Sequence, residues 1–252
     1  MLRKLTSIVV VACCGFSVRA AEVAAPPTTA MARPAELLFA DDFSRAEVGT
    51  AWKSSVRSYS IRDGVLVTGQ RPDAGHPAVC RVSVALQDCI VDFRFKFAGG
   101  SQLSLVLNDA GYKHSHAGHI CRAQVSPTAV TLGDDKEGAM KLGGVFELRS
   151  QPEKRAEYEK LIENRRTRVP HKLDIDLWHR MTVEIVGDEM LASIDGRPVA
   201  YVRSPGFAHP TKNYWGFTTQ GRFIEIDDVR AWSAVLDPTW SKRRRELFGA
   251  RR

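Results

Sequence analysis

Apolar and polar side chains alternate along most of the chain with a period of two residues. From Val91 to Phe97 every second residue is apolar, and the residues between them are Asp, Arg and Lys. The same alternation recurs over residues 104–107, 120–125, 179–186, 199–202 and 223–229. Strict alternation places one face of a segment in a core and the other in solvent, so the pattern predicts half-buried β-strands.

The turns between these segments support the same prediction. Asp63-Gly64 and Asp195-Gly196 each stand between two apolar runs, and such pairs supply the positive φ angles of tight hairpins. Many short strands separated by turns are typical of a β-sandwich or jelly roll. The sequence therefore predicts one all-β domain, with neither an internal repeat nor a second domain.

One segment breaks the period of two. Residues 152–168 contain no glycine, begin with Pro152 and are rich in Glu, Lys and Arg. Tyr158, Leu161, Ile162 and Arg165 recur three or four residues apart, which predicts one exposed helix with a narrow docking face. We expect this helix to be an insertion between strands that ends before Pro170.

The first 21 residues are typical of a signal peptide. Arg3 and Lys4 precede an apolar stretch over residues 5–18, and cleavage is expected near Ala20 or Ala21. The stretch is shorter than the ~20 apolar residues that span a bilayer, so no stable membrane insertion is expected. Residues 10–13 loosely resemble a lipobox ending in Cys13, and lipidation is the alternative to a free secreted or periplasmic protein.

Composition sets the remaining boundaries. Residues 22–35 are mostly Ala, Pro and Thr, which predicts a linker. The jelly-roll domain is then expected over residues 36–233, followed by a basic tail over residues 234–252 that is either a short helix or disordered.

The net charge of +7 is concentrated at the two ends. Residues 1–21 carry three positive charges and residues 241–252 a net five, so the remainder carries about −1. A nucleic-acid-binding domain should carry a basic stripe on its body, and we expect no nucleic-acid partner.

Cys80, Cys89 and Cys121 remain after the signal peptide. Export permits one disulfide, for which Cys80 and Cys89 are the favoured pair. Three buried reduced thiols are the alternative.

Several motifs follow one another in a recognisable order. They are Phe39-Ala40-Asp41-Asp42-Phe43, Tyr59 to Leu66, Trp178 to Gly187, Ala192 to Gly196, Trp215-Gly216-Phe217 and Ile226 to Arg230. Over about residues 37–232 the chain resembles the concanavalin-A-like jelly rolls of the laminin-G and glycoside hydrolase 16 kind. More closely it resembles the domain-of-unknown-function 1080 family, also called the 3-keto-disaccharide hydrolase domain. The resemblance implies a concanavalin-A-like jelly-roll β-sandwich with one inserted helix, a carbohydrate or glycoconjugate partner, and hydrolysis of modified disaccharides.

The catalytic motif of glycoside hydrolase 16 does not carry over to this chain. That family has three carboxylates at alternate positions of one strand. Here Glu225 and Asp227 share a strand face, but Val229 stands at the third position. The retaining mechanism is therefore not predicted from these acids.

The densest polar cluster lies between Asn108 and His119. His114 and His116 alternate and His119 follows a glycine, so three imidazoles are candidates for acid–base catalysis or metal binding. A solvated glycine-containing loop is the alternative. Tyr112 and Trp215 are candidates for sugar stacking, with burial in the core as the alternative, and Glu225 is a further candidate for substrate binding.

Two acidic clusters complete the candidates. Asp134 and Asp135 could act as an acid–base pair or hold calcium, although a polar hairpin tip is favoured. Asp41 and Asp42 at one end of the domain could meet Asp227 and Asp228 at the other end. Oxygen ligands from both ends would suit calcium, whereas exposed charges at a strand edge are the alternative.

These observations leave three functions open. The first is a secreted carbohydrate-associated jelly roll that hydrolyses glycosides such as 3-keto-disaccharides. The second is a non-catalytic carbohydrate-binding or adhesion module, and the third is an envelope structural protein whose basic tail contacts an acidic surface. Motifs that belong to strands and turns fix a fold more firmly than a function.

Overall fold

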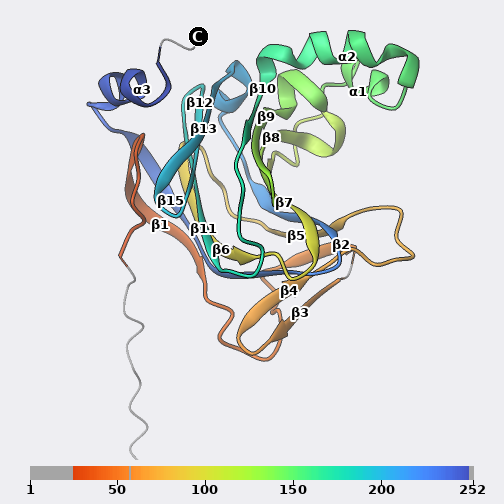
Figure 1. Cartoon of the computed structure of the whole chain (residues 1–252), viewed down its shortest axis with the longest axis vertical. Helices are drawn as coiled ribbons and strands as arrows, with labels where there is room; N and C mark the ends of the chain where they lie inside the picture. The colour runs from red at the N-terminus through yellow and green to blue at the C-terminus, as the bar shows by residue number, and fades with distance from the viewer. Residues whose placement is uncertain (1–24, 57, 250–252) are drawn as a thin grey trace, which may run out of the picture.

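The computed structural model describes residues 25–56 and 58–249, which form two packed antiparallel sheets (Figure 1). In the eight-stranded sheet the order is β13-β12-β11-β6-β15-β4-β3, and β1 pairs with β15 beside this path. Its strands are β1 (Ala32–Asp41), β3 (Tyr59–Arg62), β4 (Val65–Thr68), β6 (Cys89–Lys96), β11 (His179–Val186), β12 (Glu189–Ile194), β13 (Arg197–Arg203) and β15 (Ile224–Leu236). The predicted jelly-roll sandwich is confirmed.

The seven-stranded sheet has the order β10-β9-β8-β7-β14-β5-β2. Its strands are β2 (Lys53–Val56), β5 (Ala78–Val82), β7 (Gly100–Asn108), β8 (His119–Ser126), β9 (Ala129–Asp134), β10 (Arg166–Pro170) and β14 (Tyr214–Gly221). The two predicted Asp-Gly turns join β3 to β4 and β12 to β13, and all four of their residues have φ between 50° and 75°. These angles are those of the tight hairpin turn that the dipeptide predicts.

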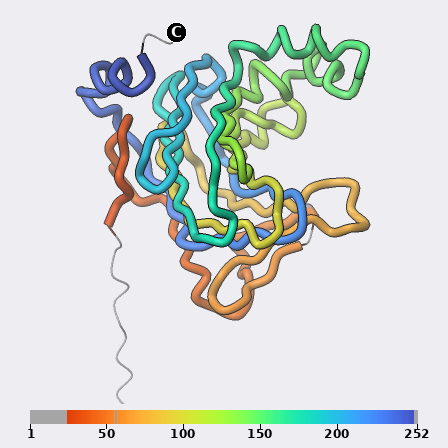
Figure 2. Tube along the Cα trace, viewed as in Figure 1, coloured from red at the N-terminus to blue at the C-terminus, as the bar shows by residue number. Residues whose placement is uncertain are grey.

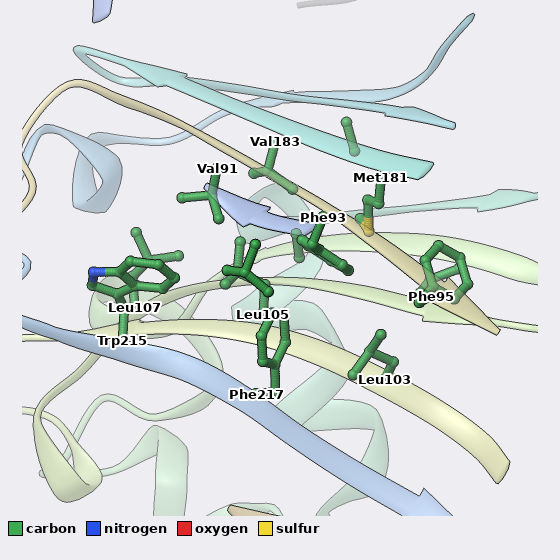
Figure 3. Packing of buried hydrophobic residues seen from close by; sticks show 14 of the residues in the cluster. Val91, Phe93, Phe95, Leu103, Leu105, Leu107, Met181, Val183, Trp215 and Phe217 are labelled. Carbon is green, nitrogen blue, oxygen red and sulfur yellow. The ribbon is translucent and has the colours of Figure 1, made fainter. Parts of the chain in front are cut away.

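The core lies between the two sheets. Figure 3 shows Val91, Phe93 and Phe95 of β6 facing Leu103, Leu105 and Leu107 of β7 across this layer. All six side chains are fully buried. The period of two therefore gave the inward face of the strands correctly, because each apolar position of the alternation lies in the core.

A mostly helical insertion connects β9 to β10. It contains a tight turn at residues 135–139, α1 (Val145–Leu148), a 3₁₀ turn at residues 152–154, α2 (Arg155–Ile162) and a last turn at residues 163–165. The helix expected over residues 152–168 therefore ends at Arg165. Residues 166–168 belong instead to β10, where they pair with β9.

Both ends of the described chain extend the domain beyond its predicted limits of 36 and 233. Strand β1 begins at Ala32, because the Glu184 carboxylate accepts hydrogen bonds of 2.7–3.0 Å from the backbone N–H groups of Ala30, Met31 and Ala32. At the other end α3 (Trp240–Phe248) packs Trp240 against Met31. Figure 2 shows this helix beside the start of β1, on the opposite side of the molecule from the insertion. The basic tail is therefore a docked helix over most of its length.

The signal peptide and the Cys13 motif lie outside the described residues, so both remain predictions. No helix within residues 25–56 and 58–249 is long and apolar enough to cross a membrane. Cys80, Cys89 and Cys121 are buried free thiols, which is the reduced alternative. Burial raises the pKa of the Cys80 and Cys89 thiols to about 12, so neither is an activated nucleophile.

Candidate functional site

The outward face of the seven-stranded sheet gathers the polar side chains that point away from the core. Strand pairing aligns one residue from each of six neighbouring strands into a single row across this face. The row is Arg81, Gly216, Val106, Arg122, Gly133 and Arg166. Three guanidinium groups therefore stand on one side of the sheet, with glycine or valine at the positions between them.

Gly216 keeps this row open and allows two strands to approach closely. Its φ is 155°, and a Cβ at this position would lie 2.2 Å from the carbonyl oxygen of Cys80. Only glycine fits so close to another backbone. The missing side chain also leaves space beside Arg81, whose guanidinium lies over the ring of Tyr214 with 5.5 Å to the ring centroid.

His119 connects to this row through Asn108. With the amide oriented so that its nitrogen faces the imidazole, Asn108 donates to His119 Nδ1 at 2.8 Å and accepts from Arg81 Nε at 3.2 Å. Burial, together with the positive charges of Arg122 and Arg81, lowers the pKa of His119 to about 2. The imidazole is therefore neutral near pH 7, and such a weak base is poorly suited to take a proton from a substrate.

The three predicted histidines do not form one cluster. His116 is exposed, stacks on Phe146 at 4.2 Å between ring centroids, and lies 6.3 Å from His119. His114 instead contacts the ring of Tyr112 at 5.5 Å. Within the described part of the chain no group of three or more His, Cys, Asp or Glu residues could hold a metal ion. The structure thus places His116 beside His119, whereas His114 lies beside Tyr112.

Asp134 and Asp135 are buried, which the favoured prediction of a polar hairpin tip did not anticipate. Each is 1% exposed, and burial raises the pKa of both carboxyl groups. Asp135 accepts from Arg122 Nε at 2.7 and 3.0 Å. Asp134 points elsewhere and accepts from the Ser204 hydroxyl at 2.5 Å and from the Gly206 N–H at 2.9 Å. The two acids therefore have different partners and do not form an acid–base pair.

The two residues predicted to stack on a sugar, Trp215 and Tyr112, lie in different environments. Trp215 is fully buried among the core residues of Figure 3 and cannot meet a sugar from solvent, so this candidate is corrected. Its position in β14 alternates inward, which is where a large apolar ring is stable. Tyr112 is half-buried, with Lys136 Nζ 5.5 Å from its ring centroid and the His209 ring at 5.1 Å. Tyr112 therefore lies at the edge of the loops and not on the sheet face.

Glu225, Asp227 and Asp228 belong to β15 in the other sheet. Glu225 pairs with Lys96 at 2.7 Å, whereas Asp227 and Asp228 face Arg94 at 3.5 and 3.8 Å. Asp228 also faces two further guanidinium groups, Arg180 at 3.5 Å and Arg230 at 3.1 Å. These acids are neutralised by bases, which leaves Glu225 outside the site on the seven-stranded sheet.

Asp41 and Asp42, the other two acids of the calcium prediction, also have protein partners for their oxygens. Strand pairing does place Asp41 opposite Val229, so the two chain ends meet as expected. Asp41, however, binds Arg45 at 2.6 Å and the Trp52 indole N–H at 2.7 Å, while exposed Asp42 accepts from the backbone of Ser44. The calcium prediction at these acids is corrected, because their oxygens face cationic partners and backbone N–H groups.

Sequence reasoning missed the arginines of the site. Arg81, Arg122, Arg149 and Arg165 are far apart in sequence and form no motif. One signal was present: Arg81 and Arg122 are single basic residues within otherwise apolar or neutral strands, Ala78–Val82 and residues 120–125. A lone charged residue on a buried strand indicates a polar contact on its outward face.

The fold is shared with solved structures of low sequence identity. A protein of unknown function with a galectin-like fold from Bacillus subtilis has a TM-score of 0.54 at 15% identity, covering 81% of this chain and 99% of that one. The laminarinase from Rhodothermus marinus has a TM-score of 0.57 at 11% identity, covering 81% and 99%. A non-specific endo-β-1,3(4)-glucanase from family GH16 has a TM-score of 0.53 at 11% identity, covering 82% and 96%.

These likenesses establish a jelly roll of the galectin-like and glycoside hydrolase 16 kind. At such identities they establish the fold alone. No protein-family model matches the chain, and no curated protein matches it in sequence. Membership of the domain-of-unknown-function 1080 family therefore stays a prediction.

Proposed function

We propose that the protein binds a saccharide on the outward face of the seven-stranded sheet and does not hydrolyse it. This is the binding-module alternative of the sequence analysis. The face carries hydrogen-bonding side chains at the positions where the core residues alternate outward, including half-buried Gln124, Thr131 and Thr218. Fixed amide and hydroxyl groups on a rigid sheet suit the hydroxyl groups of a sugar.

The observation that carries this proposal is the scarcity of carboxylates. Within the described residues, the seven strands of this sheet contain one acid, Asp134, and its side chain bonds to Ser204 and Gly206. Asp135, next to it, is held by Arg122. Glycoside hydrolysis generally uses two carboxyl groups on opposite sides of the scissile bond, about 5–9.5 Å apart. The two carboxyl groups beside this face, Asp134 and Asp135, are each 1% exposed and bonded to different protein groups, so neither is placed to act on a sugar. The low pKa of His119 removes the nearest alternative base.

The fold supports a carbohydrate ligand by analogy. The solved structures of the same fold include a laminarinase and an endo-β-1,3(4)-glucanase. Their names describe those enzymes, and the analogy contributes the ligand class to this proposal but no mechanism. Export to a compartment outside the cytoplasm, as the first 21 residues predict, would place the protein where free polysaccharides occur.

The envelope-protein alternative receives less support from the tail. Two of its basic residues are used inside the molecule: Arg243 pairs with Asp237 at 3.1 Å and Arg244 with Glu189 at 2.5 Å. Trp240 is 1% exposed and donates to Glu189 at 3.1 Å. These contacts fix the helix against the domain, so fewer charges remain for an external acidic surface.

The proposal is tested with an oligosaccharide array and a hydrolysis screen on the same purified protein. The screen includes β-glucan oligosaccharides and 3-keto-disaccharides. We expect binding without release of reducing ends. Turnover of any substrate by the wild-type protein would overturn the non-catalytic proposal and restore the hydrolase prediction.

A matched pair of variants locates the binding face. Gln124→Ala removes a half-buried amide from the face and is expected to weaken binding roughly threefold to tenfold, because one hydrogen bond contributes about 0.5–1.5 kcal/mol. Gln87→Ala removes an exposed amide from the loop between β5 and β6, and should leave affinity unchanged. Equal affinities for both variants and the wild type would place the ligand elsewhere.

A further inference from the structure

A small cavity opens between the seven-stranded sheet and the helical insertion. Its volume is about 200 Å³, with Arg122, Gln124 and Thr131 of β8 and β9 on one side and Tyr158 and Ile162 of α2 on the other. Sites for whole small-molecule ligands are generally about 300–1,000 Å³. The cavity is therefore a compartment for one group of a larger ligand that lies along the sheet.

Positive charge exceeds negative charge in the cavity wall. Four guanidinium groups line it, whereas its acids are Asp134 and Asp135. The four are Arg122, Arg149, Arg165 and Arg166. Asp135 forms an ion pair with Arg122. The Asp134 carboxylate accepts hydrogen bonds from the Ser204 hydroxyl and from backbone N–H groups.

Two of the arginines have no acidic partner. Arg166 pairs with Glu159 of α2. Within residues 25–56 and 58–249, by contrast, neither Arg149 nor Arg165 makes an ion pair. The nearest polar contacts are Arg149 Nη1 to the Met140 sulfur at 3.5 Å and Arg165 Nη1 to the Ser204 hydroxyl at 3.4 Å. Both contacts are long and neutral, so neither guanidinium group has an ion-pair partner, although the charge of Arg149 favours the ionised form of nearby Asp135.

Arg122 adds an unused donor at the same place. Its Nε bonds to Asp135, but its Nη2 is buried and has no hydrogen-bond partner in the structure. Buried donors in proteins nearly always have an acceptor, so this one points to an acceptor that a ligand supplies. The positive charge of this region also acts on His119. Burial is the main cause of its lowered pKa, Arg122 is the next, and Arg149 contributes.

We propose that this cavity is a subsite for the anionic group of an acidic saccharide, a carboxylate or a sulfate ester. Guanidinium groups present planar, fixed pairs of donors that match such oxyanions, and charged hydrogen bonds are about twice as strong as neutral ones. Gln124 and Thr131 then lie beside the anion, where they can bond to the hydroxyl groups of the same sugar. The inference rests on the proposed saccharide binding and adds the class of sugar.

The test compares sugars that differ only in charge. A galacturonic acid trisaccharide is titrated by calorimetry beside its fully methyl-esterified form, and a sulfated galactose trisaccharide beside its desulfated form. The buffer contains about 0.15 M salt, which screens long-range attraction to a basic protein. We expect at least one charged form to bind roughly tenfold to a hundredfold more tightly than its neutral partner, since one or two charged hydrogen bonds are gained. The tighter of the two identifies carboxylate or sulfate as the anion.

Three variants then assign the preference to the cavity. Arg149→Gln and Arg165→Gln each remove an unpaired charge from the wall and should reduce the preference for the charged sugar roughly tenfold. Lys160→Gln is the control, because it removes one charge from an exposed position of α2 that does not line the cavity. Circular dichroism and melting temperature confirm that each variant is folded.

The outcomes separate this inference from the proposed function. Charged and neutral forms that bind equally would overturn the anion subsite and leave saccharide binding intact. A preference that survives both arginine variants, or that falls equally in Lys160→Gln, would also overturn the subsite. Failure of every sugar to bind, neutral sugars on the array included, would overturn both proposals.

Discussion

Replacement of His119 by glutamine tests whether the arginines of the seven-stranded sheet act on their surroundings as the structure implies. In the folded protein burial and the nearby guanidinium groups lower the pKa of His119 from 6.5 to about 2. In the unfolded chain the imidazole titrates near its ordinary value of about 6.5. Between these two values the unfolded state binds a proton that the folded state does not bind.

The sign and the size of the effect follow from this difference. Stability rises with pH wherever the unfolded state binds more protons, so His119 makes the protein less stable as the pH falls below 6.5. Each pH unit in that range costs about 1.4 kcal/mol. The wild-type protein should therefore lose about 2 kcal/mol more than His119→Gln between pH 7 and pH 5.

Urea unfolding at pH 7, 6 and 5 measures this difference directly. His114→Gln is the matched control, because it removes a histidine from the neighbouring exposed loop and leaves His119 in place. Parallel stability curves for the wild type and His119→Gln would refute the reasoning. They would mean that His119 takes up its proton in the folded state despite the adjacent arginines.

Three further outcomes are expected. Trp240→Ala should lower the free energy of unfolding by about 3–5 kcal/mol and expose the C-terminal helix to proteolysis, because a buried indole is lost; Leu247→Ala, at an exposed position of the same helix, should cost less than about 0.5 kcal/mol. Glu184→Gln should cost about 1–3 kcal/mol in urea unfolding, since three backbone donors share that carboxylate, and an unchanged stability would show that this anchor contributes little. Asp135→Asn should destabilise the fold by about 3 kcal/mol while tightening the binding of an acidic trisaccharide, because Arg122 loses its counter-charge; unchanged affinity in calorimetry would count against Arg122 as a ligand contact.

The fold could be predicted because its signal is local. Alternation over residues 91–97 gave β6 and its inward face, and Asp195-Gly196 gave a hairpin with both φ angles positive. Each feature is decided by neighbours within a few residues. The same reasoning failed at residues 166–168, where an Arg-Thr-Arg segment carries no apolar alternation. Pairing with β9 makes it an edge strand, and such pairing overrides local propensity.

The domain limits were missed for a similar reason. Residues 30–32 have the composition of a linker, yet their backbone N–H groups bond to Glu184, more than 150 positions away. The side-chain composition of a segment does not reveal that its backbone N–H groups donate to a distant carboxylate. The acceptor itself lies in β11 between Val183 and Ile185, and a lone acid between two apolar residues is the local sign of such an anchor.

The spacing of the three histidines did not predict their arrangement. The rings of His116 and His119 lie 6.3 Å apart, whereas His114 contacts Tyr112. Spacing alone assumes an extended chain, but Ala117 and Gly118 have φ of 52° and 68°, so the chain turns before His119 and the spacing does not determine where the imidazoles lie. The arginines could not be grouped from the sequence at all, because strand register and the folded insertion bring residues 81, 122, 149 and 165 to one face.

The distribution of charge explains why net charge was a poor guide to the local charge of the surface. Outside the two basic ends the chain sums to about −1, which suggests a surface without a preferred sign. In the structure the acids of β15 are matched by bases of the same sheet, Glu225 by Lys96 and Asp228 by Arg180 and Arg230. Paired charges at these distances cancel each other locally, and salt screens what remains beyond about 8 Å. Arg149 and Arg165, which belong to the insertion beside the seven-stranded sheet, are therefore not neutralised by these distant acids. A nearly neutral body can thus carry a locally positive cavity wall, which the sum over the chain does not reveal.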